Sequence, residues 1–476
     1  MTVTRSIVNE QAWREAVAQL AGGRMTLLGL WGDAPSVHMA LLDESTGGIA
    51  VLTYECVDGK FPSVGAKHSP AIRLERTIRD LYGLEPAGAE DARSWLDHGV
   101  WHGGEKVSYQ FLPVEGDGLH QIPVGPVHAG IIEPGHFRFT ANGEFTVRLE
   151  QRLGYVHKGI ESLMVGASLD KAAKLAARTS GDSTVAYSYT FALAVEAALN
   201  IEVPARATYL RALVAELERL ANHLGDIGAI CNDAAFALMH AQTSVLRERC
   251  LRAALASFGH RLMMDVIVPG GVAHDIALEG LAAISTLLTE LRRRFPRLIE
   301  LYDNTASLQD RTVSTGVVKP EYVRQFGTGG YVGRASGRAF DARRTPGYAP
   351  YGKLTFDVPV RDQGDVDARV WIRIREVEQS LSLIEQIVDA LPDGPVAAEV
   401  KSAGEPREGL ALAEAFRGDV LVWLRLDADG HVARCHLRDA SWFQWPLLET
   451  AIEGNIVADF PLCNKSFNCS YSGHDL

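Results

Sequence analysis

Six cysteines are the side chains best able to hold a soft metal ion or an iron–sulfur cluster, because the ligand in both cases is a thiolate. None of them forms the C-x-x-C pair that is typical of zinc sites and iron–sulfur clusters. Cys463, Cys469 and His474 suggest a metal trio, but their spacing is unusual and a fourth ligand is missing. The pattern favours ordinary thiols near a buried C-terminus in a reduced, cytosolic chain over a metal site. The six are Cys56, Cys231, Cys250, Cys435, Cys463 and Cys469.

A carboxylate at Glu161 has a sequence context that suits proton transfer. It is flanked by the apolar residues Ile160 and Leu163, so we expect it to be partly buried with a raised pKa. The alternative is a glutamate near the start of a helix, where the helix dipole stabilises its charge. Both interpretations stay open at this point.

A glycine-rich stretch at Gly327–Gly330 superficially suggests a phosphate-binding loop. Val332 occupies the last glycine position of a G-x-G-x-x-G motif, and the stretch lacks the strand and helix of a βαβ unit around it. We interpret it as a glycine-rich connection and not as a nucleotide site.

Composition excludes several classes of function. The formal net charge of −12 and the pI near 5.7 disfavour a nucleic-acid partner, because phosphate binding needs clustered Lys and Arg. The sequence has no apolar run of about 18 residues, and the first fifteen positions include Arg5, Glu10, Arg14 and Glu15 where a signal sequence needs a hydrophobic run. We therefore expect a cytoplasmic chain that contacts a membrane only through partners.

The first 110 residues predict a small α/β unit. A helix is expected at 9–21, strands at 25–30, 37–42 and 49–55, and a further helix near Pro70. Residues 83–105 are rich in Gly, Ala and acidic residues, which indicates a linker. We place a domain boundary near residue 110, between domains at 1–110 and 111–476.

The second unit is expected to be mainly helical. A β-hairpin is predicted at 137–150 around Asn142-Gly143, because Asn-Gly supplies the positive φ of a tight turn. Apolar residues then recur at three- and four-residue steps in long helices, and in one of them Gly225 and Gly228 suit the end. The fold class is therefore α+β, a small N-terminal α/β unit followed by a helical bundle. The helices are expected at 206–227, 242–264, 278–301 and 369–391, with short strands at 421–426 and 432–437.

Several short blocks follow one another along the second unit in a fixed order. They are Gly125–His128, Glu133–Arg138, Tyr155–Glu161, Gly333–Gly337, Tyr348–Tyr351, Gly364–Asp365 with Arg373–Glu376, and Val457–Leu462. In residue type and order they resemble the large subunit of formate hydrogenlyase-type (group 4) nickel–iron hydrogenases and the related 49-kDa subunit of complex I. Phe61–Val64 and Leu74–Gly83 are similar to the 30-kDa subunit of complex I. The resemblance implies that a 30-kDa-like docking domain is fused to a hydrogenase-type large-subunit domain.

The resemblance breaks at the metal ligands. The hydrogenase motif R-x-C-G-x-C retains Arg178 and Gly181 but none of its cysteines, and the matching C-terminal motif has lost both of its own. The four cysteine positions hold Ser180, Ser183, Ser470 and Gly473. A thiol ionises near a pKa of about 8.5, whereas a serine hydroxyl stays protonated in water, so affinity for a soft metal is not expected here. We expect no nickel–iron centre in this chain.

The resemblance also implies a quinone contact. In complex I a histidine and a tyrosine are thought to hold the quinone headgroup, and the histidine corresponds to His136. The tyrosine position falls at Gly181, so half of that clamp is missing, although Tyr187 and Tyr189 lie one or two helical turns on. The alternative for His136 is a turn histidine bonded to nearby backbone.

Two further residues acquire a role from the resemblance. Glu161 matches the glutamate that hydrogenases use to pass protons from the metal, and Arg178 is expected either to face a partner's iron–sulfur cluster or to pair with an internal acid. With the metal ligands lost, the old pocket is expected to be polar and able to hold water or conduct protons. The polar residues expected there are Ser180, Asp182, Ser183 and Ser470.

These implications combine into one expected function, carried by family analogy. The chain is expected to be a peripheral subunit on the cytoplasmic side of a membrane-associated oxidoreductase of the hydrogenase or NADH–quinone oxidoreductase kind, coupled to ion translocation. No cofactor is expected in the chain itself; an iron–sulfur cluster in a small 20-kDa-like partner and a quinone would serve the assembly, together with antiporter-like membrane subunits. Two alternatives stay open, an atypical nickel–iron hydrogenase and a non-catalytic structural or coupling subunit.

Overall fold

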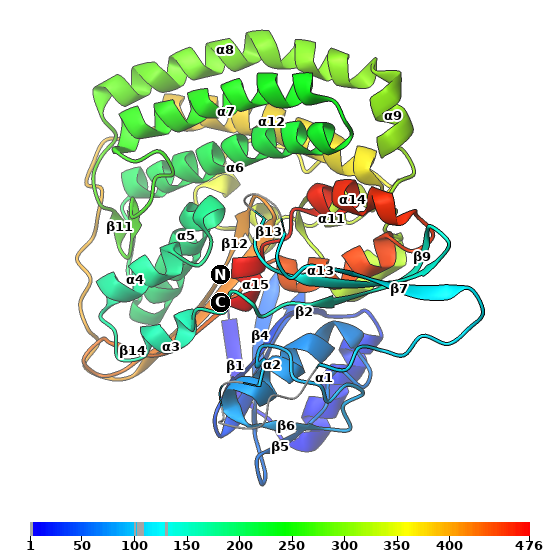
Figure 1. Cartoon of the computed structure of the whole chain (residues 1–476). Coiled ribbons are helices and arrows are strands. Elements are labelled where there is room, and N and C mark those ends of the chain that lie inside the picture. Colours follow the sequence, from blue (N-terminus) through cyan, green and yellow to red (C-terminus); the bar gives the residue numbers. More distant parts are fainter. Residues whose placement is uncertain (1–2, 100, 102–108, 129–131) are drawn as a thin grey trace.

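The computed structural model describes residues 3–99, 101, 109–128 and 132–476, which form long helices and small β-sheets (Figure 1). The predicted α+β fold class is confirmed, with a small sheet module at the N-terminus and a larger, mainly helical part. Within the described ranges no helix is long and apolar enough to cross a membrane. The domain boundary near residue 110 lies beside residues 102–108, which are outside the described part, and it stays a prediction.

The N-terminal module is a four-stranded sheet in the order β1-β4-β3-β2, with β1 parallel to β4 and the other neighbours antiparallel. Asn9 begins the first helix by accepting a hydrogen bond from the Ala12 amide (2.9 Å). The predicted strands correspond to β2, β3 and β4, whereas β1 was not predicted because its mostly exposed residues show no apolar alternation. The elements are β1 (Val3–Ile7), α1 (Glu10–Ala21), β2 (Thr26–Asp33), β3 (Ser36–Asp43), β4 (Gly48–Glu55), β5 (Lys60–Pro62), α2 (Ile72–Tyr82) and β6 (Glu85–Ala87).

The segment predicted to be a linker is packed against the module where the structure describes it. Trp95 is buried, and the guanidinium groups of Arg73 and Arg76 lie 4.6 Å and 4.7 Å from its ring centroid. These cation–π contacts hold the segment in place, so the linker prediction is wrong for residues 83–99. Residues 100 and 102–105 of the predicted linker lie outside the described residues.

An antiparallel sheet in the order β7-β8-β9 follows and projects from the body (Figure 1). Gly143 has a φ of 58° in the turn between β8 and β9, which confirms the predicted hairpin. The strands are β7 (Leu119–Val124), β8 (His136–Asn142) and β9 (Phe145–Arg152).

The larger part contains a stack of long helices, in which α6, α7, α8 and α12 lie side by side (Figure 1). Their apolar faces form one extended core, as the helical periodicity predicted. The helices are α3 (Ile160–Met164), α4 (Leu169–Ala177), α5 (Thr184–Leu199), α6 (Ala205–Asp233), α7 (Ala237–Phe258), α8 (Leu278–Asp303), α9 (Ala306–Thr312), α10 (Pro320–Phe326), α11 (Gly330–Ala335) and α12 (Val366–Asp389); β10 (Ile267–Val268) and β11 (Gly271–Val272) form a short pair.

Gly225 and Gly228 do not end a helix, because α6 continues to Asp233. A Cβ added at Gly228 would lie 2.0 Å from Thr243 Oγ1, and one added at Gly225 would lie 3.0 Å from the Arg247 side chain. Both neighbours belong to α7. The glycines therefore permit a close approach of two helices, and the prediction that they terminate α6 was wrong.

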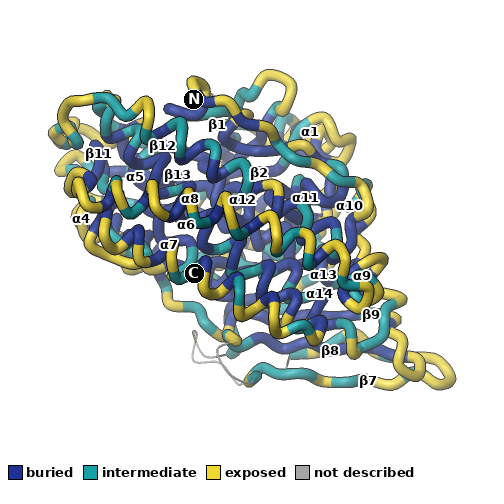
Figure 2. The backbone as a smooth tube through the Cα atoms, turned by 90° about the horizontal axis from the view of Figure 1, so that it is seen from above, coloured by how far each residue is buried: buried dark blue, intermediate teal, exposed yellow. Residues whose placement is uncertain are grey.

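The C-terminal part adds a three-stranded antiparallel sheet, β12-β13-β14, and three helices. One face of this sheet packs on the N-terminal sheet and the other is covered by α5 and other helices, so its strands are buried on both faces (Figure 2). The predicted strands are confirmed as β13 and β14, while β12 was not predicted. The elements are β12 (Arg407–Ala415), β13 (Gly418–Leu426), β14 (Val432–Arg438), α13 (Ser441–Ala451), α14 (Phe460–Phe467) and α15 (Tyr471–Asp475).

Candidate functional site

Two segments that lie 290 residues apart in the sequence meet at the degenerate metal position. Ser180 precedes the helical turn that leads into α5, and Ser470 begins α15 by accepting a hydrogen bond from the Gly473 amide (2.8 Å). The hydroxyl oxygens of Ser180 and Ser470 lie 3.3 Å apart. The structure therefore brings the two ligand motifs together in one place.

The site has little free space at Gly473. A Cβ added to this glycine would lie 2.7 Å from Asp439 Oδ2 and 2.8 Å from Ser470 Oγ. Both distances are shorter than ordinary contacts, so a side chain at this position would force its neighbours to move. The C-terminal half of the old ligand set is therefore closed by the protein itself.

A bidentate ion pair between Asp182 and Arg417 stands beside the two serines. Arg417 Nη1 and Nη2 lie 2.8 Å and 2.6 Å from the carboxylate oxygens, and Ser180 Oγ donates to Asp182 Oδ1 (2.8 Å). Burial alone would raise the pKa of Asp182, but Arg417 and the hydroxyls of Ser180 and Ser183 hold it below the ordinary value. The carboxylate is therefore ionised at neutral pH.

Asp439 connects this cluster to neighbouring helices. It accepts hydrogen bonds from the Tyr187 hydroxyl (2.7 Å) and the Ser441 amide (2.8 Å), and Ser441 Oγ accepts from the Ser470 amide (2.8 Å). The Tyr189 hydroxyl donates to the Ala349 carbonyl (3.0 Å). Burial raises the pKa of both phenols, so Tyr187 and Tyr189 are protonated donors that already have protein acceptors.

His136 begins β8 close to the C-terminal segment. Its Nδ1 lies 3.1 Å from the Gly125 carbonyl, and Arg138 Nε donates to its Nε2 (3.2 Å), so the neutral tautomer carries its hydrogen on Nδ1. Burial lowers the pKa of His136 below its ordinary value. A Cβ added at the preceding Gly135 would lie 2.6 Å from the Tyr471 ring, which places the hairpin directly against the segment that carries Ser470.

Glu161 is buried at the junction with the N-terminal module, and its predicted raised pKa is wrong. Its carboxylate accepts hydrogen bonds from Arg434 Nη1 (2.9 Å), His436 Nδ1 (2.8 Å) and the Leu437 amide (2.9 Å). Burial raises the pKa, but the charge of Arg434 and the contact with His436 outweigh it and lower the pKa to about 2. The carboxylate is ionised and fully bonded; Arg434 and His436 come from β14, and the Tyr82 hydroxyl of α2 makes a longer contact (3.5 Å).

Arg178 lies at the end of α4 and pairs with Asp265 near the surface. Its Nη2 lies 2.7 Å from Asp265 Oδ2, and its Nη1 also contacts this carboxylate. Its side chain is 43% exposed. This matches the ion-pair alternative for Arg178, although the pair is not internal, and it leaves the guanidinium within reach of a partner protein.

Comparison with known proteins identifies the family. Residues 233–411 match the family described as the respiratory-chain NADH dehydrogenase 49 Kd subunit. Formate hydrogenlyase subunit 5 of Escherichia coli (strain K12) is 32% identical over 437 residues, which cover 87% of this chain and 77% of that protein. The chain belongs to the large-subunit family of such hydrogenases and complex I.

Two further relatives extend the family across both of its branches. Hydrogenase-4 component G of Escherichia coli (strain K12) is 30% identical over 463 residues, 92% of this chain and 80% of that protein. An NADH-quinone oxidoreductase subunit of Phocaeicola vulgatus is 28% identical over 439 residues, 84% of this chain and 84% of that protein. These similarities confirm the family resemblance that the sequence blocks indicated.

The donor set of this large subunit does not fit a nickel–iron centre. Such a centre needs thiolates, and the positions that would supply them carry hydroxyls at Ser180 and Ser470 that bond to each other. Cys463 and Cys469 are buried, and burial raises the pKa of Cys463 to about 11 and that of Cys469 further, so both are protonated. Across the described residues no three His, Cys, Asp or Glu side chains are placed to hold a metal ion.

His474 also has other partners. Its ring is stacked on Trp442 with centroids 3.9 Å apart, its Nδ1 bonds to Asp475 (2.8 Å), and Trp95 Nε1 donates to its Nε2 (3.3 Å). Both ring nitrogens are thus used inside the protein. The metal trio considered from the sequence therefore has no support in the geometry.

Sequence reasoning missed the residues that hold the site together. Arg417 lies in the turn between β12 and β13, and Arg434 and His436 alternate along β14. For Arg434 and His436 the signal available was ionisable residues in a strand that also carries buried apolar residues, since a buried charge needs a partner. Which partner each would meet depended on contacts across more than 200 residues of sequence.

Proposed function

We propose that this chain is the large subunit of a membrane-associated, complex I-like oxidoreductase, and that it carries no nickel–iron centre. The observation that carries the proposal is the contact between Ser180 and Ser470, whose oxygens lie 3.3 Å apart where the family's thiolates would stand. The Asp182–Arg417 pair supports it further, because it occupies the site with two opposite charges that already satisfy each other.

In this proposal the redox groups belong to the assembly and not to the chain. An iron–sulfur cluster in a small 20-kDa-like subunit supplies electrons, and a quinone accepts them close to the hairpin that carries His136. Antiporter-like membrane subunits couple this transfer to ion translocation, with the chain on the cytoplasmic side of the membrane. The relatives named as hydrogenase and NADH–quinone oxidoreductase subunits support such an arrangement.

The chain's own contribution would be to position the acceptor. His136 is a neutral imidazole held by the Gly125 carbonyl, and Arg138 places a guanidinium 3.2 Å from its Nε2. A quinone oxygen that displaced this contact would accept a hydrogen bond from the Arg138 guanidinium, whose positive charge would stabilise negative charge gained on reduction. The quinol hydroxyl formed by reduction could then donate to the freed Nε2 of His136. The Arg138 guanidinium also lies 4.5 Å from the Phe111 ring centroid, an aromatic surface next to the same position.

A non-catalytic coupling subunit is the second candidate, favoured by a specific observation. Both ring nitrogens of His136 and both carboxylate oxygens of Glu161 already have partners within the protein. Groups that are fully bonded in this way stabilise the fold without needing a substrate.

Quinone reduction by the purified complex separates the two candidates. We expect a short-chain quinone to be reduced by the chemically reduced complex, and His136→Ala to lower the rate by about a hundredfold, the scale of losing a positioned hydrogen-bonding group. His240→Ala, at an exposed histidine of α7, is the matched control. The coupling subunit is favoured if the intact wild-type complex reduces no quinone. It is also favoured if the intact His136→Ala complex reduces quinone at the wild-type rate.

A further inference from the structure

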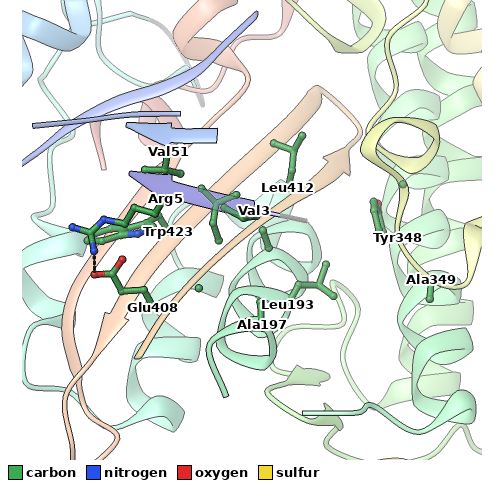
Figure 3. Close-up of a pocket in the computed structure, with 14 residues that line it drawn as sticks. Val3, Arg5, Val51, Leu193, Ala197, Tyr348, Ala349, Glu408, Leu412 and Trp423 are labelled. Carbon is green, nitrogen blue, oxygen red and sulfur yellow. Dashed lines mark hydrogen bonds and ion pairs between the residues drawn. The ribbon is translucent and has the colours of Figure 1, made fainter. Parts of the chain in front are cut away.

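An open groove lies at the rim of the interface between the N-terminal sheet and the β12-β13-β14 sheet (Figure 3). Its volume is about 460 Å³, and Val3, Arg5, Leu193, Leu412 and Trp423 are among the residues that line it. A second hollow of about 560 Å³ lies next to it. The two are neighbours because residues 347–349 line both of them.

Two unpaired strand edges border this groove. β1 ends one sheet and β12 ends the other, and within the described residues neither pairs with another strand on its outer side. The consecutive residues Glu408–Leu412 all line the groove. Successive side chains of a strand point to opposite faces, so a strand lines a cavity with consecutive residues only along its edge. Farther along β12 the Glu414 amide donates to the Tyr348 hydroxyl (3.2 Å) and Arg219 donates to the Glu414 carbonyl (2.8 Å), so only the part of the edge that lines the groove is open to an added strand. Residues 409–412 of that part are buried, so an added strand would reach them from within the groove.

The walls of the groove are apolar except at one end, where Arg5 of β1 and Glu408 of β12 form an ion pair (Figure 3). Leu412 and Trp423 belong to the core between the two sheets, and Val3 packs against it from the edge of β1. Leu193 and the exposed Ala197 of α5 form the opposite wall. A strand inserted here would bury alternate apolar side chains on one wall or the other.

The second hollow is positively charged. Arg344 and Lys353 line it with exposed side chains, and Arg343 lies behind them in buried ion pairs with Asp341 and Glu216. The described lining of this hollow contains no carboxylate. This stands out on a chain with a formal net charge of −12, and it favours an occupant that carries acidic residues at this end.

We propose that the groove docks an extended segment of a partner subunit, which pairs with the free edge of β12 and places acidic side chains beside Arg344 and Lys353. A stretch of about five residues is enough to follow the part of the edge that lines the groove, at roughly 3.3 Å per residue. The inference rests on the proposed function in one respect, namely that the chain works in an assembly with other subunits.

Zero-length cross-linking of the purified complex tests the docking site. A carbodiimide joins a lysine amine to a carboxylate in direct contact, so we expect a cross-link from Lys353 to an Asp or Glu in a segment of a partner subunit. Lys353→Gln removes that cross-link, whereas Lys171→Gln, at an exposed lysine of α4, leaves it unchanged. Mass spectrometry of the digest identifies the segment.

A second variant blocks the groove without altering the core. Ala197→Trp adds a large side chain at an exposed position of the α5 wall, and Ala282→Trp on α8 is the matched control away from the groove. We expect Ala197→Trp to lower the yield of the Lys353 cross-link by about tenfold, the loss typical of an interface anchor. Ala282→Trp should change neither.

Results that refute the docking site differ from results that refute the proposed function. The docking site alone is overturned if the complex is intact but Lys353 forms no cross-link. It is also overturned if Lys353 is linked only to this chain or to a second copy of it. A cross-link to a partner that Ala197→Trp leaves unchanged overturns it as well. A chain that purifies from its native source without any partner overturns the proposed function together with the docking site.

Discussion

Glu161→Gln should loosen the attachment of the N-terminal module. Arg434 connects the Glu161 carboxylate to the Gly32 carbonyl of β2 (2.9 Å and 3.0 Å), and the Tyr82 hydroxyl of α2 approaches the same carboxylate at 3.5 Å. The pKa of Glu161 is lowered from 4.5 to about 2, and one pKa unit is about 1.4 kcal/mol, so the ionised group contributes about 3 kcal/mol. Because the folded pKa is depressed, this contribution is complete above pH 4.5 and is lost as the pH falls toward 2.

Hydrogen exchange of the purified complex at pH 7 measures this effect. Lowering the free energy of local opening by about 3 kcal/mol should make amides in β2 and β14, including the Leu437 amide, exchange about a hundredfold faster. Amides of α7, which lies far from the junction, should not change. Glu202→Gln, at an exposed glutamate, is the control. Unchanged protection of β2 and β14 in Glu161→Gln would refute the role of this carboxylate in joining the two parts.

Three further predictions concern glycine packing and the hairpin histidine. Gly473→Ala should lower the melting temperature and the yield of the complex, because its Cβ would lie 2.7 Å from Asp439 Oδ2. Gly181→Ala is the control and should be neutral, because a Cβ added there has no neighbouring atom within 4 Å. Gly228→Ala should destabilise the α6–α7 contact by about 1–3 kcal/mol in chemical unfolding, while Gly225→Ala, which meets only the flexible end of a long side chain, should cost less. His136→Ala should leave assembly intact on size-exclusion chromatography while lowering quinone turnover; loss of assembly would instead indicate a packing role.

The fold was largely predictable because its elements carry local signals. Short apolar runs predicted β2, β3 and β4, helical periodicity predicted the long helices, and Asn142-Gly143 predicted the hairpin turn. The errors have a common physical origin. Gly228 looks like a helix end in the sequence, but Thr243 of a neighbouring helix needs the space that it leaves. The strand β12 has the sequence REGLALAEA, and its Ala and Glu residues are depleted in strands, so only its contacts with β13 make it one.

The site was only half predictable. Family motifs located Ser180 and Ser470, and the structure places their hydroxyls in contact. The protonation of Glu161 was misjudged, because local sequence shows the apolar neighbours that raise a pKa but not the Arg434 and His436 side chains that lower it. The partner of Asp182 is Arg417, and no pattern near either residue links the two. Contacts between distant strands decide the charge states, and these exist only once the chain is folded.

Nickel content is the most direct test of the central claim. Elemental analysis of the purified complex should find nickel far below one atom per chain, and hydrogen–deuterium exchange with dihydrogen should be absent, because hydroxyls at Ser180, Ser183 and Ser470 offer no bridging thiolate. Stoichiometric nickel together with hydrogen turnover would contradict the account. It would require the buried thiols of Cys463 or Cys469 to ionise and serve as ligands, which would identify the chain as an atypical hydrogenase.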